Sequence, residues 1–167
     1  MQISMFQASV PCFAHMLGNL SAILGKAEAH CEAKKIDPLA LVAARLYPNM
    51  LPLARQVMVA CDAAKGAVAR LAGIDNPKHE DVEKTLPELR ARIAKTQAFV
   101  ASLTPAQIDG SEERPVVLKF GARELNFTGL QYLTSFALPN FYFHVTTAYD
   151  ILRHNGVELG KSDYLAG

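Results

Sequence analysis

Two polar side chains, Asn140 and His144, are the best candidates for a chemical site in this sequence. They stand four residues apart inside a stretch with helical periodicity, so both lie on the same face of one helix. Two imidazoles at this spacing can reach one metal ion, but asparagine is a poor zinc ligand. The pair therefore favours a polar pocket with a hydrogen-bonded histidine over a metal site, and it specifies no reaction.

The other histidines offer less chemistry. His79 falls in a polar stretch, His30 near a helix end, and His154 in a last helical turn, where the dipole favours a cation. We expect these three side chains to be structural or solvated. His15 lies in an amphipathic stretch and is expected to face the protein core or its edge.

The cysteines do not predict a nucleophile. Cys12, Cys31 and Cys61 are widely spaced and form no C-x-x-C pair, which is typical of reduced thiols rather than a disulfide framework. Cys61 falls on the buried side of its helix, where a thiol is usually inert. Asp62 and Glu28 are interpreted as surface charges, and the sequence has no glycine-rich phosphate loop and no G-x-S-x-G motif.

The candidate pair must be positioned by a long helix that we predict from Thr128 to Gly156. Thr128 and Gln131 have the spacing of a capping box, and Gly156 can end the helix in a left-handed conformation. Pro139 donates no amide hydrogen, so it releases the carbonyl of Ser135 and predicts a bend. The predicted buried stripe comprises Leu130, Leu133, Ala137, Phe141, His144, Ala148 and Ile151.

Three further long helices are predicted from apolar residues at steps of three and four. The first begins near Ile3, ends near Lys34 and contains Pro11, which predicts a kink or a late start. The second is capped by Asn49 and ended by Gly73, and the third begins at a capping box on Thr85. Their stripes are Phe6, Val10, Phe13, Leu17, Leu20 and Leu24; then Leu53, Val57, Ala60, Ala64, Val68 and Leu71; then Leu86, Leu89, Ile93, Thr96, Phe99, Val100 and Leu103.

Shorter elements connect these helices. Asp37-Pro38 begins a short helix, and residues 73–84 form a polar loop. Apolar residues alternate on both sides of Gly121-Ala122, which predicts a β-hairpin lying on the helices. The tail, residues 157–167, has no period. The sequence thus predicts an all-α four-helix bundle with one short helix and a hairpin before the last helix, as a single domain over residues 1–167.

Composition excludes several classes of partner. The chain has 167 residues, half of them apolar, and a net charge of +1, so no charge bias favours nucleic acid. Residues 1–25 contain no Asp, Glu, Lys or Arg, but their interspersed polar residues favour an amphipathic helix over a membrane span. We expect a cytoplasmic protein without membrane contact. Because Phe141, Tyr142 and Phe143 face three directions on a helix, part of this run predicts a homodimer interface.

Three segments, taken together, resemble a known family. They are SMFQASVPCFAHMLGNLSAIL at the start, LPLARQV on the second long helix, and FALPNFYFHVTTAYDILRHNGVELGK at the end. With their spacing, they are similar to the DinB/YfiT-like superfamily of four-helix bundles, within a bacterial branch known as a domain of unknown function. This resemblance implies an up-down-down-up bundle in which residues 73–84 are the crossover.

The resemblance also implies where a metal would bind. Metal-binding members of that superfamily hold a divalent ion with one histidine from the second helix and an H-x-x-x-H pair from the last. Here His144 matches the later histidine of the pair, Arg153 matches an arginine that follows it, and Asn140 replaces the earlier histidine. The matching stretch of the second helix, RQVMVACD, has no histidine, and Ala60 or Cys61 stands nearest the expected position.

Our first hypothesis is therefore a non-enzymatic or small-ligand-binding homodimer without a cofactor. Its degenerate metal site would be a polar pocket formed by Asn140, His144 and, as a third wall, Gln56. The alternative is a divalent-metal-dependent thiol transferase or hydrolase in which His144 is a ligand, with Cys61, Gln56 or Asn140 completing the site. A third hypothesis, a purely structural interaction module, predicts an exposed apolar surface around residues 141–143 and no enclosed pocket.

Overall fold

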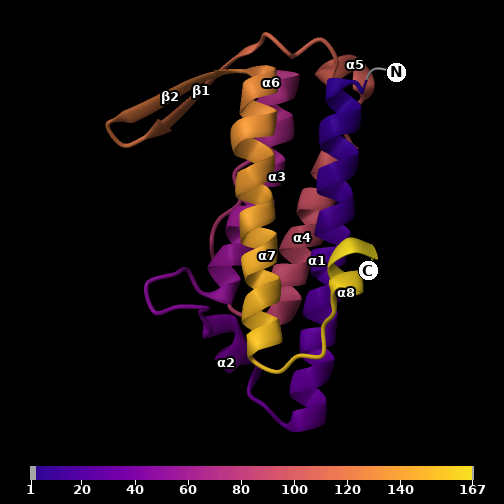
Figure 1. The fold of residues 1–167 in the computed structure, drawn as a ribbon, viewed down its shortest axis with the longest axis vertical. Helices are drawn as coiled ribbons and strands as arrows, with labels where there is room; N and C mark the ends of the chain where they lie inside the picture. Colours follow the sequence, from indigo (N-terminus) through magenta and orange to yellow (C-terminus); the bar gives the residue numbers. More distant parts are fainter. Residues whose placement is uncertain (1–2, 167) are drawn as a thin grey trace.

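Four long helices surround one apolar core in the computed structural model, which describes residues 3–166 (Figure 1). In chain order the elements are α1 (Met5–Lys34), α2 (Pro38–Ala43), α3 (Leu53–Ala72), α4 (Leu86–Ala101), α5 (Pro105–Ile108), β1 (Pro115–Phe120), β2 (Arg123–Thr128), α6 (Gly129–Tyr132), the π-helical turn η1 (Leu133–Ala137), α7 (Leu138–His154) and α8 (Lys161–Ala166). The predicted all-α bundle, with a short helix and a hairpin before the last helix, is confirmed.

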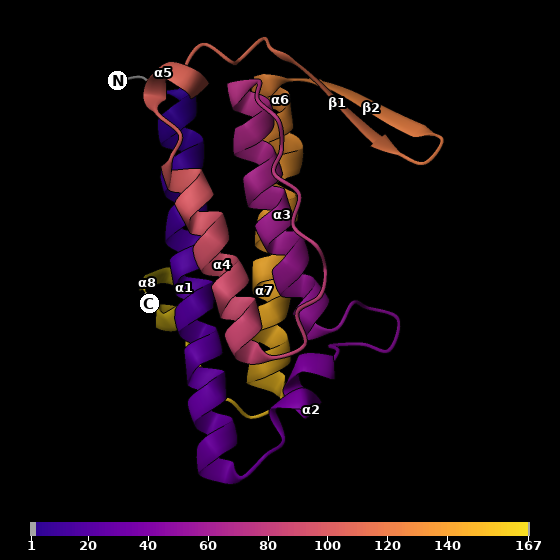
Figure 2. The same ribbon diagram turned by 180° about the vertical axis from the view of Figure 1, so that it is seen from behind.

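The long helices have the predicted up-down-down-up order. α1 and α7 run one way along the long axis, and α3 and α4 run the other way (Figures 1 and 2). Because α3 and α4 are parallel, their connection must return along the whole bundle, and residues 73–85 do so on its outer side (Figure 2). α3 packs against both α7 and α4, and α1 packs against α4.

The core of the bundle is made by the predicted apolar stripes. Phe13 of α1 and Phe141 of α7 are fully buried and meet edge to face, with ring centroids 5.0 Å apart. α1 has the length and mean hydropathy of a membrane span, 1.2 over 18 residues, but half of that stretch is buried inside the protein. This burial is that of a core helix in a soluble domain.

Local capping explains where the first helices begin and end. Ser4 caps α1 in a reciprocal box with Gln7, and α1 continues through Pro11 without a break. The predicted cap at Asn49 is wrong, since α3 starts only after Pro52, and the amide of Leu53 donates to the carbonyl of Ala44 instead. α3 ends at Gly73 as predicted, in a left-handed conformation with φ +68°.

The last helix contains a π turn that the sequence pattern did not predict. It begins at the predicted capping box between Thr128 and Gln131, and Gly156, at φ +89°, follows its last turns. Residues Leu133–Ala137 form η1, in which the amide of Leu138 donates five residues back to Leu133. The added residue shifts the helical phase, so Leu130 is 46% exposed and is not part of the buried stripe as predicted.

The predicted hairpin is present and projects from one end of the bundle (Figure 1). β1 and β2 pair antiparallel, with Val116 opposite Phe127 and Leu118 opposite Leu125. Val116 and Leu118 are buried, and the ring of Phe127 lies 5.8 Å from that of Phe136. The apolar face of the hairpin therefore rests on the start of the last helix.

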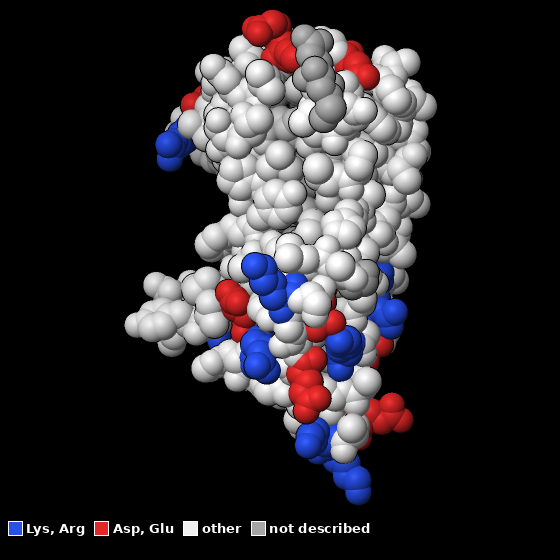
Figure 3. All heavy atoms as spheres, turned by 45° about the vertical axis from the view of Figure 1, so that its right-hand side comes forward, with Lys and Arg blue, Asp and Glu red and all other residues white. Residues whose placement is uncertain are grey.

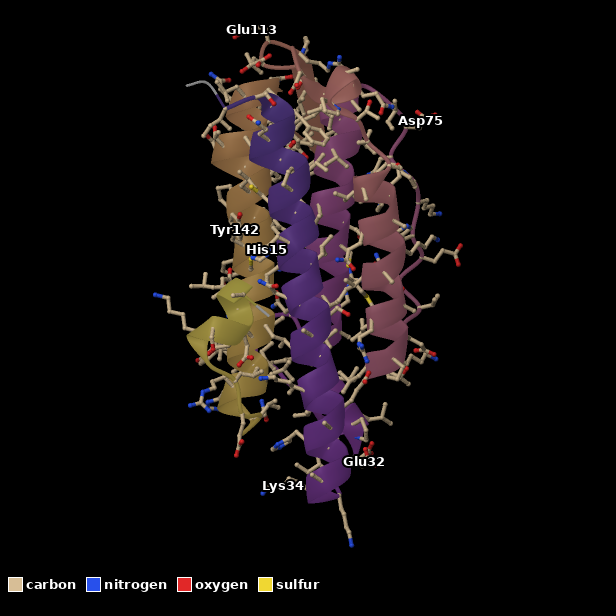
Figure 4. All side chains as sticks on the ribbon, turned by 90° about the vertical axis from the view of Figure 1, so that its right-hand side faces the viewer. His15, Glu32, Lys34, Asp75, Glu113 and Tyr142 are labelled. Atoms are coloured by element: carbon tan, nitrogen blue, oxygen red, sulfur yellow. The ribbon has the colours of Figure 1, made fainter. Side chains whose placement is uncertain are left out.

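The tail folds back along the bundle as a short helix, α8, that was not predicted. The carbonyls of Leu165 and Tyr164 lie 2.8 Å from Nε2 of His15 and from Nδ2 of Asn19, both on α1. His15 is exposed and lies close to the level of α8 (Figure 4). Because these contacts are polar and join distant parts of the chain, a periodic apolar pattern could not indicate them.

Candidate functional site

His144 is held by a side chain from the neighbouring long helix. Its Nδ1 lies 2.6 Å from Oε1 of Gln56 in a buried contact. Gln56 is in the first turn of α3, and His144 is in the second turn of α7, which packs antiparallel against α3. The structure thus brings together two of the three residues predicted for a pocket.

The orientation of the Gln56 amide fixes the tautomer of His144. Nε2 of Gln56 donates to the carbonyl oxygen of Leu51 at 3.0 Å. A flipped amide would place Oε1 against that carbonyl, so Oε1 must face His144 and accept a hydrogen from Nδ1. Burial lowers the pKa of His144, so the ring is neutral at neutral pH. Its Nε2 therefore keeps a lone pair, while its Nδ1 proton is used by Gln56.

Asn140 lies apart from this pair, in a cleft that Gln56 and His144 do not line. The cleft has a volume of about 270 Å³ and lies between α3, the last helix and the hairpin. The Asn140 side chain makes no hydrogen bond to any residue from 3 to 166. We call this space the Asn140 cleft. Its lining residues are Val59, Asp62, Ala63, Arg70, Leu118, Phe120, Tyr132, Phe136, Ala137 and Asn140.

An arginine and a group of aromatic rings give the Asn140 cleft its character. Nη1 of Arg70 donates to the hydroxyl of Tyr132 at 3.1 Å. The Tyr132 ring stacks on Phe136 with centroids 6.1 Å apart, and Phe120 of the hairpin lies 6.2 Å from Phe136. Burial raises the pKa of Tyr132, so its hydroxyl stays protonated. The cleft combines an apolar, partly aromatic wall with one cation, one carboxylate, that of Asp62, and one free amide.

The sequence analysis did not identify Arg70 or the aromatic wall. Arg70 follows Gly66 by four residues, and a lone glycine inside a helical pattern indicates close approach of another group. That signal was available but does not name the group. Tyr132 and Phe136 line the cleft because of the π turn, which the apolar pattern of the sequence does not predict.

Asp62, which we predicted to be a surface charge, is 42% exposed and is paired with buried cations. Its Oδ1 lies 3.0 Å from Nη2 of Arg92 and 3.6 Å from Nζ of Lys65. Arg92 is 3% exposed and also binds Asp81 and Glu83 of the crossover. The sequence did not reveal this pairing, because Arg92 lies on another helix, 30 positions away along the chain.

The donor set around His144 does not fit the three-histidine metal site that the family resemblance implies. It offers one imidazole, and the oxygen of Gln56 already accepts from that imidazole. Cys61 lies elsewhere, beside Thr96 and Arg92, and burial raises the pKa of its thiol to about 12, so it does not supply a thiolate. Within residues 3–166, no three His, Cys, Asp or Glu side chains are placed to hold one ion.

The remaining predicted residues have other partners or none. Glu28 pairs with Arg90 across α1 and α4 at 2.8 Å. His30 lines an open hollow beside Val157, and His154 is exposed. His79 is half-buried in the crossover, and burial lowers its pKa.

Comparison with known proteins identifies relatives over almost the whole chain. Residues 5–165 match the family described as a domain of unknown function, DUF1993. Among solved structures, the chain is similar to a DinB family member protein from Shewanella denitrificans. The sequence identity is 44% and the TM-score 0.87, over 97% of this chain and 92% of that chain. No curated protein matches the chain.

Proposed function

The chain belongs to the DUF1993 family of DinB-like helical bundles, and on that premise we propose that it is a cytoplasmic, non-enzymatic protein that binds a small molecule in the Asn140 cleft. The observation that carries this proposal is the free amide of Asn140 in a concave, largely apolar space. Small-molecule sites are typically concave and apolar, with a few polar groups that orient the ligand.

The groups that face the Asn140 cleft favour binding over catalysis. Acid–base catalysis needs a group that titrates near the working pH. Tyr132 has a raised pKa, and the carboxylate of Asp62 is held by Arg92 and Lys65. His144, which keeps a free Nε2, does not line the cleft. The degenerate site is accordingly a structural pair, Gln56–His144, next to a binding space.

Filling the Asn140 cleft with a side chain tests this proposal. Ala63→Phe places a ring in the cleft, and Ala98→Phe adds the same ring to an exposed position of α4 as a matched control. A mixture of neutral, anionic and cationic fragments is titrated against ¹⁵N-labelled protein. The wild type and Ala98→Phe should show shifts at Asn140, Val59 and Phe136, and Ala63→Phe should show none. If no fragment shifts these signals in the wild type, the proposal is wrong.

The homodimer is the second part of the proposal. Residues 3–25 and 125–149 contain no Asp, Glu, Lys or Arg, and Figure 3 shows a broad uncharged band over α1 and α7, with mixed charges below it and acidic side chains at the top end. Phe143 is 57% exposed on α7, whereas Phe141 is buried. We propose that a second copy of this chain covers this face, since depletion of charge is typical of an interface core.

Sedimentation over a concentration series tests the dimer. Phe143→Glu should shift the equilibrium to monomer, because it would bury a carboxylate without a partner. Val82→Glu is the control, since Val82 is 65% exposed in the crossover, away from α1 and α7. A wild-type protein that stays monomeric at every concentration would refute the proposed homodimer but not the proposed ligand site.

A further inference from the structure

Arg70 brings a positive charge to the Asn140 cleft that no carboxylate neutralises. Among residues 3–166, Arg70 forms no ion pair with Asp or Glu. Its partner is the uncharged hydroxyl of Tyr132, whose ring centroid also lies 5.8 Å from its Cζ. A partly buried guanidinium usually binds a carboxylate or a phosphate, often with two parallel hydrogen bonds. The missing partner therefore indicates an anionic ligand.

The one acidic side chain of the cleft does not cancel this charge. Asp62 lies eight residues before Arg70 on α3, two helical turns away. Its carboxylate pairs with Arg92 and Lys65, at the part of the cleft away from Arg70, and Arg92 is shared with Asp81 and Glu83 of the crossover. The Arg70 end of the cleft stays positive.

Gly66 sets the position of the Arg70 guanidinium. A Cβ at residue 66 would lie 2.4 Å from Nη1 of Arg70, so the guanidinium rests on the bare backbone of α3. Glycine is disfavoured inside a helix, yet here it is what lets Arg70 lie back beside Tyr132. The missing side chain of Gly66 and the hydrogen bond to Tyr132 together place the guanidinium at the cleft.

We propose that the Asn140 cleft binds a small organic anion with a flat apolar body. Its carboxylate would pair with Arg70, its ring would lie against Phe120 and Phe136, and a polar atom would meet Asn140. The volume of about 270 Å³ is just below the usual range of ligand pockets, roughly 300 to 1,000 Å³, which suits a small molecule with one ring. This inference rests on the proposed function and specifies the class of ligand.

Phenylacetate and its neutral isostere phenylacetamide provide the test. Each is titrated into the full-length protein, and the dissociation constant is taken from shifts of the Asn140, Val59 and Phe136 signals. Because hydrogen bonds to charged groups are the stronger ones, phenylacetate should bind at least about tenfold more tightly than phenylacetamide. Equal affinities would refute an anionic ligand but would not refute the binding site. Binding of neither compound in the millimolar range would overturn both proposals.

Three variants test whether Arg70 causes the preference for phenylacetate over phenylacetamide. Arg70→Gln should bind the two compounds equally, and Arg153→Gln, an exposed site on α7 outside the cleft, should keep the preference. Gly66→Ala retains the charge but displaces the guanidinium, so it should reduce the preference while the helix remains intact. If Arg70→Gln does not fold, Gly66→Ala decides. An unchanged preference in Gly66→Ala would contradict the proposed placement of the Arg70 guanidinium against the backbone at Gly66, and with it the pairing of the anion with Arg70.

Discussion

Removing one partner of the Gln56–His144 hydrogen bond should destabilise the bundle more than removing both. Gln56→Leu leaves the Nδ1 hydrogen of His144 without an acceptor, and His144→Leu leaves Oε1 of Gln56, a residue 1% exposed, without a donor. An unsatisfied buried polar group costs about 1–3 kcal/mol. The hydrogen bond to the carbonyl of Leu51 adds less, because it is only partly buried and water can replace Nε2 of Gln56.

The double variant Gln56→Leu/His144→Leu should recover most of this loss, since replacing both partners with apolar groups of similar size is nearly neutral. Urea unfolding followed by circular dichroism measures the free energies of unfolding of the wild type, the two single variants and the double variant. We expect a coupling energy of about 1–3 kcal/mol. The exposed hydroxyl pair Thr146 and Tyr164, 2.9 Å apart, is the control and should couple weakly. Additive losses at positions 56 and 144, within about 0.5 kcal/mol, would refute the pairing and the tautomer derived from it.

Three further predictions concern pH, the buried charges and the thiols. Since burial lowers the pKa of His144, the unfolded state binds more protons than the native state between the native pKa and about 6.5. The contribution of neutral, buried His144 to the free energy of unfolding is therefore complete above about pH 6.5. It is lost as the pH falls from there toward the native pKa. His144→Leu should reduce this pH dependence of the free energy of unfolding. Arg92→Met should cost about 1–3 kcal/mol, because it leaves the largely buried carboxylate of Glu83 without its cation, whereas the carboxylates of Asp62 and Asp81 are 42% and 38% exposed and stay solvated. That loss is a fall in Tm of roughly 5 °C, whereas Arg90→Met, at an exposed ion pair, should cost below about 1 kcal/mol. A thiol reagent followed by mass spectrometry should modify half-exposed Cys12 in the native protein and spare Cys61, which is buried and has a pKa of about 12. Rapid native labelling of Cys61 would contradict its packing.

The long helices could be predicted because their signals are local and repeated. Apolar spacing in α1, α3 and α4 gave the buried stripes, and the Thr128 and Thr85 capping boxes gave two helix starts. The crossover followed from the family resemblance. The cap at Asn49 failed because Pro52 fixes an extended start that Asn49 is too far away to serve.

The site was less predictable because its contacts join residues far apart in the sequence. His144 and Gln56 are 88 positions apart, and only packing of α3 on α7 brings them together. In the sequence, Arg92 and Lys65 look like ordinary charged residues of a helix surface. Their partners Asp81, Glu83 and the carbonyl of Pro77 come from the crossover, which covers them only in the folded protein. Spacing along the chain contains no information about such partners.

The π turn connects the irregular part of the last helix to the binding space. Counting back from Phe141 in a regular helix, Leu133 and Leu130 should face the core. One extra residue in η1 moves the preceding positions by about 100°, so Tyr132 is buried and Leu130 is exposed. Pro139, which has no amide hydrogen to donate, makes a regular turn here less favourable. The same shift places Tyr132 within reach of Arg70 on α3. The Asn140 cleft therefore depends on this irregular turn, and the anion-binding arrangement follows from it and from Gly66 together.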